Sequence, residues 1–258
     1  MGCSFLSDAQ VQRGMDIDGE MAADESGFSV SLADPYTIAV GARRNTGNGS
    51  NAGHVRVFSW DGSSWEQKGE DIDGEAPDDQ SGFVVDMPDS NTVAIGARLN
   101  DDNGTDAGHV RIYHWIDNEW TQKGPDIDGE AAGDNSGWSL SMCDANTVAI
   151  GARSNNGGAT SSGHVRVYTW DGTAWIQQGT DIDGEMANDD FGYSVSLSDP
   201  NTPDKLVHPT IDNKGRLLGG FYTGVPGKNP NTSETHTYTY CVNGTSPFYS
   251  LGYWYSSN

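Results

Sequence analysis

The sequence predicts an all-β fold: a β-propeller of four-stranded antiparallel blades with a 55-residue repeat. Three observations lead to this prediction. The motif Asp-Ile-Asp-Gly-Glu recurs at a constant interval, each unit holds short β-rich runs between turns, and no window has apolar residues at helical spacing. A fixed period of this length indicates a repeat architecture, in which each unit buries its apolar faces against its neighbours. The motif begins at Asp16, Asp71, Asp126 and Asp181.

The first unit supplies four candidate strands. Residues 26–32 and 36–42 are β-rich runs joined by a tight Ala-Asp-Pro turn, and residues 54–60 form a third run. After an Asp-Gly turn, residues 65–72 form the fourth. Four antiparallel strands in this order are typical of a propeller blade, so full blades are expected at 26–72, 81–127 and 136–182.

The two ends of the repeat region predict a split or partial fourth blade. Residues 8–17 align with the end of a unit and are expected to form an orphan fourth strand. Residues 191–197 begin another unit, and the repeat is lost after Pro200. We expect any closure to pair residues 11–17 with strands that follow Phe191, because unpaired strand edges invite aggregation.

The chain divides by composition into residues 1–202, the repeats, and residues 203–258, a divergent segment rich in Tyr, Thr and Gly. This segment either completes the last blade or forms a β appendage. Two hairpins are expected in it: residues 206–211 with 216–223, and residues 235–242 with 248–255 around Asn243-Gly244.

The order of motifs in a unit resembles the FG-GAP repeat of integrin α-chain-like β-propellers. Phe191-Gly192 matches the opening Phe-Gly, and Gly-Ala-Arg at Gly41, Gly96 and Gly151 stands where the family has Gly-Ala-Pro. The resemblance covers about residues 8–200 and implies an extracellular or cell-surface adhesion module. The family binds calcium between the first two strands, where this chain has only a three-residue turn, so those metal residues are not carried over.

Charge narrows the classes of partner. The net charge is −23, and residues 203–258 hold four bases against three acids, which leaves −24 for residues 1–202. Such a surface repels the phosphates of nucleic acids and of anionic membranes. No apolar run is long enough for a membrane helix, and residues 1–10 lack the features of a signal peptide. Nucleic-acid binding and membrane insertion are therefore not expected.

The acidic connection between units is the strongest chemical signal. Its acids stand at positions 1, 3, 5 and 9, and oxygen ligands so spaced around a glycine turn can converge on Ca²⁺. The alternative is that they cap strand ends and accept hydrogen bonds from loop amides. The candidate calcium ligands are Asp16, Asp18, Glu20, Asp24, Asp71, Asp73, Glu75, Asp79, Asp126, Asp128, Glu130, Asp134, Asp181, Asp183, Glu185 and Asp189.

A second loop, between strands two and three, supplies candidate ligand-binding residues Asp101, Asp102, Asn103 and Asp106. Successive strands of a blade alternate in direction, so this loop and the connection between units lie on one face. Ligand-binding residues commonly lie on loops that a rigid scaffold positions. We therefore expect ligand and calcium on this acidic face.

Residues that recur in every unit are interpreted as architecture, because a catalytic site is used once. This interpretation covers the tryptophans beside the Asp-Gly turn and the recurring basic residues Arg43, Arg98, Arg153, His54, His109, His164, Arg56, Arg111 and Arg166. The residues that break the repeat show no arrangement of nucleophile, base and orienting acid. The sequence therefore predicts no enzyme.

The favoured function is a non-enzymatic extracellular or cell-surface adhesion or recognition module, which binds a protein or glycan on its acidic face. One alternative is the propeller scaffold of a larger exported enzyme. Another is carbohydrate binding by the aromatic segment, through His236, Tyr238, Tyr240 and Trp254, whose rings could stack on sugars.

Overall fold

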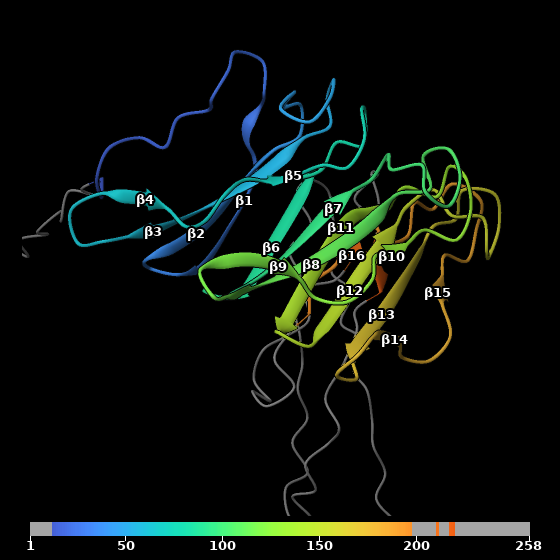
Figure 1. Cartoon of the computed structure of the whole chain (residues 1–258). Coiled ribbons are helices and arrows are strands. Elements are labelled where there is room, and N and C mark those ends of the chain that lie inside the picture. Colours follow the sequence, from blue (N-terminus) through green and yellow to red (C-terminus); the bar gives the residue numbers. More distant parts are fainter. Residues whose placement is uncertain (1–11, 198–209, 212–216, 220–258) are drawn as a thin grey trace, which may run out of the picture.

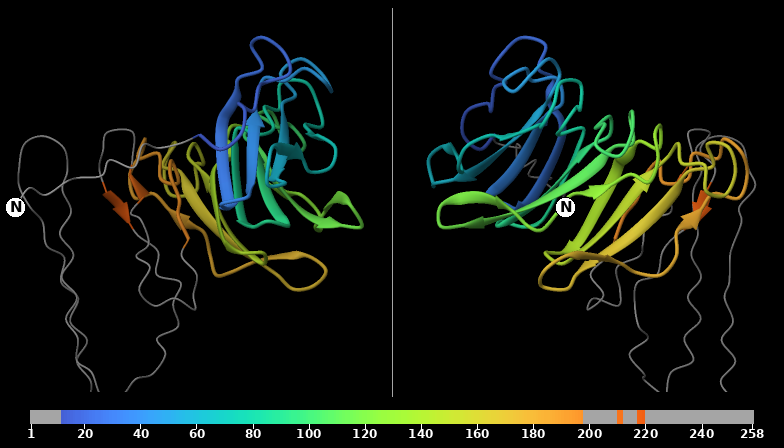
Figure 2. Two further views of the ribbon diagram at one scale, coloured as in Figure 1. Left: turned by 90° about the vertical axis from the view of Figure 1, so that its left-hand side faces the viewer. Right: turned by 45° about the vertical axis from the view of Figure 1, so that its right-hand side comes forward.

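The fold is all-β. The computed structural model describes residues 12–197, 210–211 and 217–219, and within them it contains strands and turns but no helix. Three antiparallel sheets follow one another along the chain and stack face to face as a fan (Figures 1 and 2). The repeated, propeller-like arrangement predicted from the 55-residue period is confirmed.

The first sheet has the order β1-β2-β3-β4, with β5 also paired to β3. The bounds are β1 Ser26–Asp34, β2 Thr37–Ala42, β3 His54–Trp60, β4 Trp65–Gln67 and β5 Ile72–Asp73. The second sheet comprises β6 Val84–Asp89, β7 Thr92–Ala97, β8 His109–Ile116, β9 Glu119–Gln122 and β10 Ile127–Asp128. The third comprises β11 Ser136–Asp144, β12 Thr147–Ala152, β13 His164–Trp170, β14 Trp175–Gln177 and β15 Ile182–Asp183.

The fourth strand of each unit differs from the sequence prediction, because it is broken into two short segments. In the first sheet the break follows Lys68, whose amide still donates to the carbonyl of Val57 (2.7 Å). The next residue, Gly69, has φ +82°, and a Cβ there would lie 2.6 Å from the Trp115 ring of the next sheet. The break thus brings the backbone of one unit against the aromatic residues of the next.

The N-terminal stretch takes the position of a fourth strand without forming one. Residues 12–17 belong to no strand. Trp65 Nε1 nevertheless donates to the carbonyl of Arg13 (3.0 Å), just as Trp120 Nε1 donates to the carbonyl of Lys68 one unit later (2.7 Å). The expected strand is therefore not formed over residues 12–17, and residues 8–11 lie outside the described part of the chain.

The fourth unit is represented by residues 191–197, which form no ladder among the described residues. Phe191 makes an isolated parallel bridge to Gly163, and both Phe191 and Leu197 are buried against the third sheet. Among the described residues, no pairing joins the first sheet to this unit. Of the hairpin expected at residues 206–211 and 216–223, the structure describes β16 (Thr210–Ile211) paired antiparallel with β17 (Leu217–Gly219), and the rest lies outside the described residues. The expected 235–242 and 248–255 hairpin lies outside the described residues.

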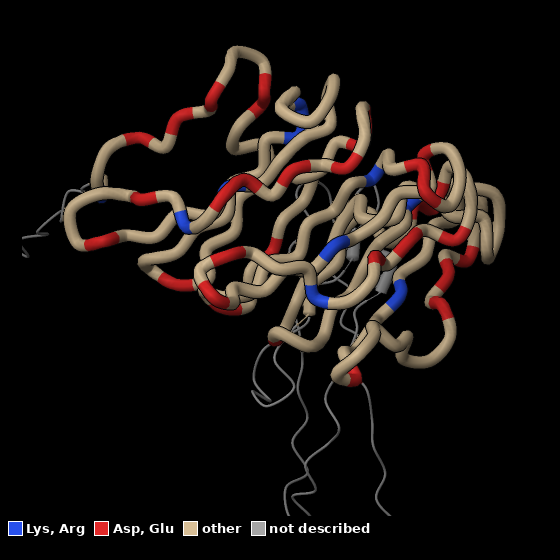
Figure 3. The backbone as a smooth tube through the Cα atoms, viewed as in Figure 1, with Lys and Arg blue, Asp and Glu red and all other residues tan. Residues whose placement is uncertain are grey.

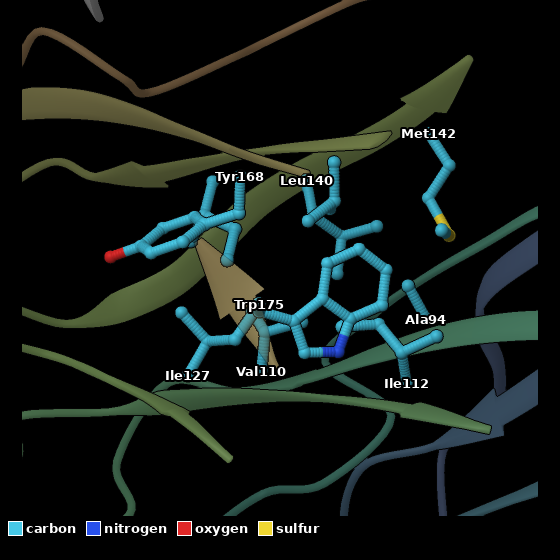
Figure 4. Close-up of a cluster of buried hydrophobic side chains, with 10 residues drawn as sticks. Ala94, Val110, Ile112, Ile127, Leu140, Met142, Tyr168 and Trp175 are labelled. Carbon is cyan, nitrogen blue, oxygen red and sulfur yellow. The ribbon is translucent and has the colours of Figure 1, made fainter. Parts of the chain in front are cut away.

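The core lies between successive sheets. Between the first two, Val55, Val57 and Ile72 meet Val85 and Met87. The next interface repeats this composition, with Tyr168 and Trp175 at the positions that Tyr113 and Trp120 occupy in the first (Figure 4). Each sheet therefore buries its apolar face only against a neighbouring sheet, as expected for repeats.

Successive first strands are held in register by side chains. The amide of Met87 donates to Ser31 Oγ (3.0 Å) and that of Met142 to Asp86 Oδ2 (2.7 Å), so each acceptor lies 56 residues before its donor. Aromatic rings 55 residues apart also meet across the sheets: the ring centroid of Phe83 lies 5.1 Å from that of Trp138, and Arg98 lies over both rings. The period of the sequence thus becomes a ladder of contacts across the sheets.

The long loops gather at one end of the fan. In each unit, the connection between the second and third strands lies beside the connection to the next sheet: Asn48 Nδ2 donates to the carbonyl of Gly74 (2.7 Å), and Asn103 Nδ2 to that of Gly129 (2.7 Å). Many of the acidic residues lie along these loops (Figure 3). The prediction that both acidic loops share one face is confirmed. The described part of the chain has no helix with the length and apolar character needed to cross a membrane.

Candidate functional site: three histidine–carboxylate clusters

On the loop face, the same three residue types meet once in every unit. Each cluster contains one Glu, one His and one Asp whose candidate ligand atoms lie within 4.8 Å of one another. The members repeat at 55-residue intervals. They are Glu20, His54 and Asp71; then Glu75, His109 and Asp126, joined by Asp102; then Glu130, His164 and Asp181.

The topology explains why these residues meet. His54 is the first residue of β3, directly after the second-to-third-strand loop, and it pairs with Asp73 of β5. Glu20 comes from the connection that leads into the unit, and Asp71 from the connection that leads out of it. Each cluster is therefore assembled from both ends of one unit.

The imidazoles are buried and lack hydrogen bonds at Nδ1. The side chains of His54, His109 and His164 are 1%, 0% and 1% exposed. Their Nδ1 atoms have no hydrogen-bond partner. The nearest Asp Oδ2 lies 3.3, 3.6 and 3.6 Å away, and the nearest Glu Oε2 lies 3.9, 3.8 and 3.7 Å away. In each cluster, the imidazole Nδ1, one Asp oxygen and one Glu oxygen therefore face one another, and Nδ1 makes no hydrogen bond.

The aspartates and Glu75 are held through the oxygen that faces away from the imidazole. Gln67 Nε2 donates to Asp71 Oδ1 (2.7 Å), which leaves Oδ2 toward the imidazole, and Gln177 does the same for Asp181 (2.6 Å). On the glutamate side, Arg111 NH1 lies 3.3 Å from Glu75 Oε1, while Oε2 faces His109. In the first and third clusters, the Glu20 and Glu130 Oε2 atoms that face the imidazole also accept from Asn45 Nδ2 (3.3 Å) and Asn155 Nδ2 (3.4 Å). The clusters are therefore oriented by partners outside them, an arrangement characteristic of metal ligands.

The second cluster has an additional donor. Asp102 lies in the loop before β8, and the equivalent positions of the first and third units are Gly47 and Gly157. Nearby, Asp128 Oδ1 is buried without a hydrogen-bond partner. The second unit thus concentrates more oxygen atoms than the other two.

Burial shifts the pKa values of this cluster in the directions expected for a desolvated site. Burial raises the pKa of Glu75, Arg111 opposes this, and the charges of Asp126 and Asp102 add to it. Burial likewise raises the pKa of Asp128, with Asp126 adding to the effect. Burial and then the charge of Arg111 lower the pKa of His109 to about 3, so its imidazole is neutral at pH 7.

The sixteen acids proposed as calcium ligands separate into distinct roles. Positions 1 and 5 enter the clusters, except Asp16 and Glu185, which belong to none among the described residues. Position 9 is buried: Asp79 Oδ2 accepts from the amide of Ala76 (3.0 Å) and from Asn100 Nδ2 (3.2 Å). The Oδ2 atoms of Asp24, Asp134 and Asp189 accept the equivalent hydrogen bond from a backbone amide three residues earlier.

At position 3, the contacts run through the backbone. The carbonyl of Asp73 accepts from Arg111 NH2 (2.7 Å), and those of Asp18 and Asp128 accept from the equivalent arginines. Asp183 lies at the same position of the last connection, with its Oδ1 close to Gly157. The four acids of one connection therefore do not converge on one point. The acids at positions 1 and 5 of the connection between two sheets instead face two different clusters, which belong to successive units.

The candidate ligand-binding residues of the second loop are also divided. Asp102 joins a cluster, whereas Asp101 Oδ1 accepts from the amide of Asp106 (2.8 Å) and Asn103 ties the loop to the next connection. The four aromatic-segment residues, His236, Tyr238, Tyr240 and Trp254, lie outside the described residues.

Sequence reasoning assigned the three histidines to architecture because they recur. The signal that places them in the clusters was nevertheless present: each histidine begins the third strand on the face where both acidic loops were expected. Recurrence alone did not separate a repeated site from a repeated packing residue. The recurring arginines do make structural contacts, since Arg43 lies 3.9 Å from the Phe28 ring centroid and Arg153 3.6 Å from that of Trp138.

The chain was compared with known proteins. No protein-family model matches it, and no curated protein matches it.

Proposed function

We propose that this chain is a non-enzymatic recognition module of the FG-GAP, integrin α-like type. It acts outside the cell or at the cell surface and binds a protein or glycan through the acidic loop face. The observation that carries the proposal is the placement of both loops of every unit on one face, tied to each other and to the sheets. Asp79, for example, fixes its own connection and, through Asn100, the neighbouring loop.

A rigid, repeated loop face suits recognition because the contact residues are already ordered before the ligand arrives. The exposed acids of the second loop, Asp101 and Asp102, would meet basic groups of a protein ligand. Divalent cations bound on this face would also bridge to a glycan hydroxyl or an acidic side chain. Calcium is the ion that the carboxylate spacing in the sequence predicts, and on this proposal it binds at acids outside the histidine–carboxylate clusters, such as Asp73 and Asp128.

The direct test probes the unmutated chain with a glycan array and with a panel of basic and neutral glycoproteins. A loop-face variant, Asp101→Asn with Asp106→Asn, keeps the side-chain shapes and removes two charges. A matched variant, Glu66→Gln with Glu119→Gln, removes two charges from the hairpin ends at the other face. The proposal expects binding that the first variant reduces and the second does not. Equal effects, or no binding by the unmutated chain, would contradict it.

The calcium part is tested by thermal unfolding in calcium and in excess chelator. Bound calcium stabilises the folded state by mass action, so the unfolding midpoint should rise in calcium. Asp73→Ala and Asp128→Ala should reduce that rise. A midpoint indifferent to calcium in the unmutated chain would remove calcium from the proposal.

A further inference from the structure

The chemistry of the three clusters differs from that of an oxygen-only site. Each offers one imidazole nitrogen and two carboxylate oxygens, and the second adds a third carboxylate. Calcium takes six to eight oxygen ligands, whereas imidazole with carboxylate suits zinc and related first-row ions. The donor set therefore favours a transition-metal ion over calcium.

Distances within the clusters agree with that choice. Zinc lies about 2.0–2.2 Å from nitrogen and oxygen ligands, so neighbouring ligand atoms of a tetrahedral site are about 3.3–3.6 Å apart. The separation of His Nδ1 from Asp Oδ2 is 3.3 Å in the first cluster and 3.6 Å in the other two. The glutamate oxygens lie slightly farther, at 3.7–3.9 Å from Nδ1. A small ion fits between these atoms with only small side-chain shifts.

The unpartnered Nδ1 atoms point independently to a ligand. A buried polar atom without a partner is costly, and native proteins contain few. Here the same atom is unpartnered in all three units, on side chains at most 1% exposed. It faces the two carboxylates, which are themselves held by Gln and Arg partners. A metal ion would satisfy the imidazole and neutralise the carboxylates together.

We propose that the three histidine–carboxylate clusters are binding sites for a zinc-class divalent transition-metal ion, one ion per unit. Two carboxylates and one imidazole hold the ion, and solvent or a ligand group completes its coordination. The partly exposed glutamates, 40–43% exposed, form the open side of each site. The inference does not rest on the recognition function, because the ion would bind whether or not the loop face has a partner.

The second cluster should bind most tightly, since Asp102 supplies a fourth protein ligand there. Replacing this residue by the glycine found in the other units, Asp102→Gly, should weaken this site by at least about tenfold, the effect that even outer-sphere partners show. The reverse change, Gly47→Asp, should strengthen the first site. A Cβ at Gly47 meets only Asn45 Oδ1 at 3.0 Å and Asp73 Oδ1 at 3.8 Å, both side-chain atoms.

The experiment titrates the full, tag-free chain with Zn²⁺ by isothermal calorimetry after treatment with chelator. Three ions per chain are expected, and His109→Asn should leave two. Because His109 is fully buried and its replacement can disturb folding, Glu75→Gln serves as the second variant, with the same expected loss. His114→Asn on the same strand and Glu70→Gln before β5 lie outside the clusters and should keep three ions.

Competition with Ca²⁺ separates the zinc-class site from a general acidic surface. Calcium at a hundredfold excess should not displace the zinc. Displacement by calcium at equal concentration, zinc binding unchanged in both His109→Asn and Glu75→Gln, or no zinc binding by the unmutated chain would each overturn the proposal. A chain that binds three zinc ions but no glycan or glycoprotein would refute the recognition function alone.

Discussion

Val30 and Val85 occupy the same position of successive units, but their surroundings differ. Val85 is 5% exposed and packs against Val55, Val57 and Ile72 of the first sheet, whereas Val30 is 52% exposed. Shortening each to alanine removes the same atoms from two different environments. The structure therefore predicts unequal losses of stability from identical substitutions.

The expected magnitudes follow from burial. Val85→Ala removes two buried carbon atoms, worth about 0.8 kcal/mol each, and leaves a small cavity, so the loss is about 2 kcal/mol. Val30→Ala should cost less than about 0.5 kcal/mol, as exposed substitutions do. For a chain of this size, 2 kcal/mol lowers the unfolding midpoint by about 4–8 °C.

The assay is thermal and urea unfolding of the two variants beside the unmutated chain. A second pair, Met87 (4% exposed) and Leu32 (59% exposed), gives an independent comparison one strand pleat away. Equal losses at Val30 and Val85 would refute the reasoning, because they would mean that the outer face of the first sheet is covered in solution.

Three further predictions concern the contacts between loops and units. Lys68→Met removes an ammonium group that donates to Ser90 and lies over two tryptophans, so urea unfolding should show a loss of about 1 kcal/mol, with Glu70→Gln unchanged. Asp79→Ala leaves the buried Asn100 Nδ2 and the partly buried amide of Ala76 without an acceptor and should cost about 2 kcal/mol, more than the same change at exposed Asp78; equal costs would contradict this. For His109, the pKa in the folded state, about 3, lies below the unfolded value, so the unfolded state binds more protons between pH 3 and 6.5. Stability in chelator should therefore fall as pH drops from 6.5 toward 3, and less so in His109→Asn; identical urea midpoint changes between pH 7 and 5 in the two proteins would refute this.

The sequence predicted the architecture well because its period is strict and its strand signals are local. It did not predict the break after Lys68, since that break depends on a contact between Gly69 and Trp115 of the next unit. It predicted a strand at residues 8–17 from alignment alone, but in the described part of that stretch, residues 12–17, a single segment without a paired neighbour forms no ladder.

The site was predicted in part. Spacing along one connection grouped Asp71, Asp73, Glu75 and Asp79, yet the fold turns Asp71 toward His54 and Glu75 toward His109. Linear spacing does not report which side of a connection faces which unit. That the loops share one face followed from strand direction, and the histidine at the start of each third strand would have completed the prediction.

Assembly of each cluster from both ends of one unit has a consequence for how such an array can lengthen. Glu20 precedes the first sheet and Asp71 follows it, with His54 between them. A tandem duplication of any 55-residue window of the array would therefore add one complete cluster without new mutations. It would leave the existing clusters intact, because each glutamate would still find its histidine 34 residues onward and its aspartate 51 residues onward. Gene duplication alone could thus set the number of clusters in step with the number of sheets.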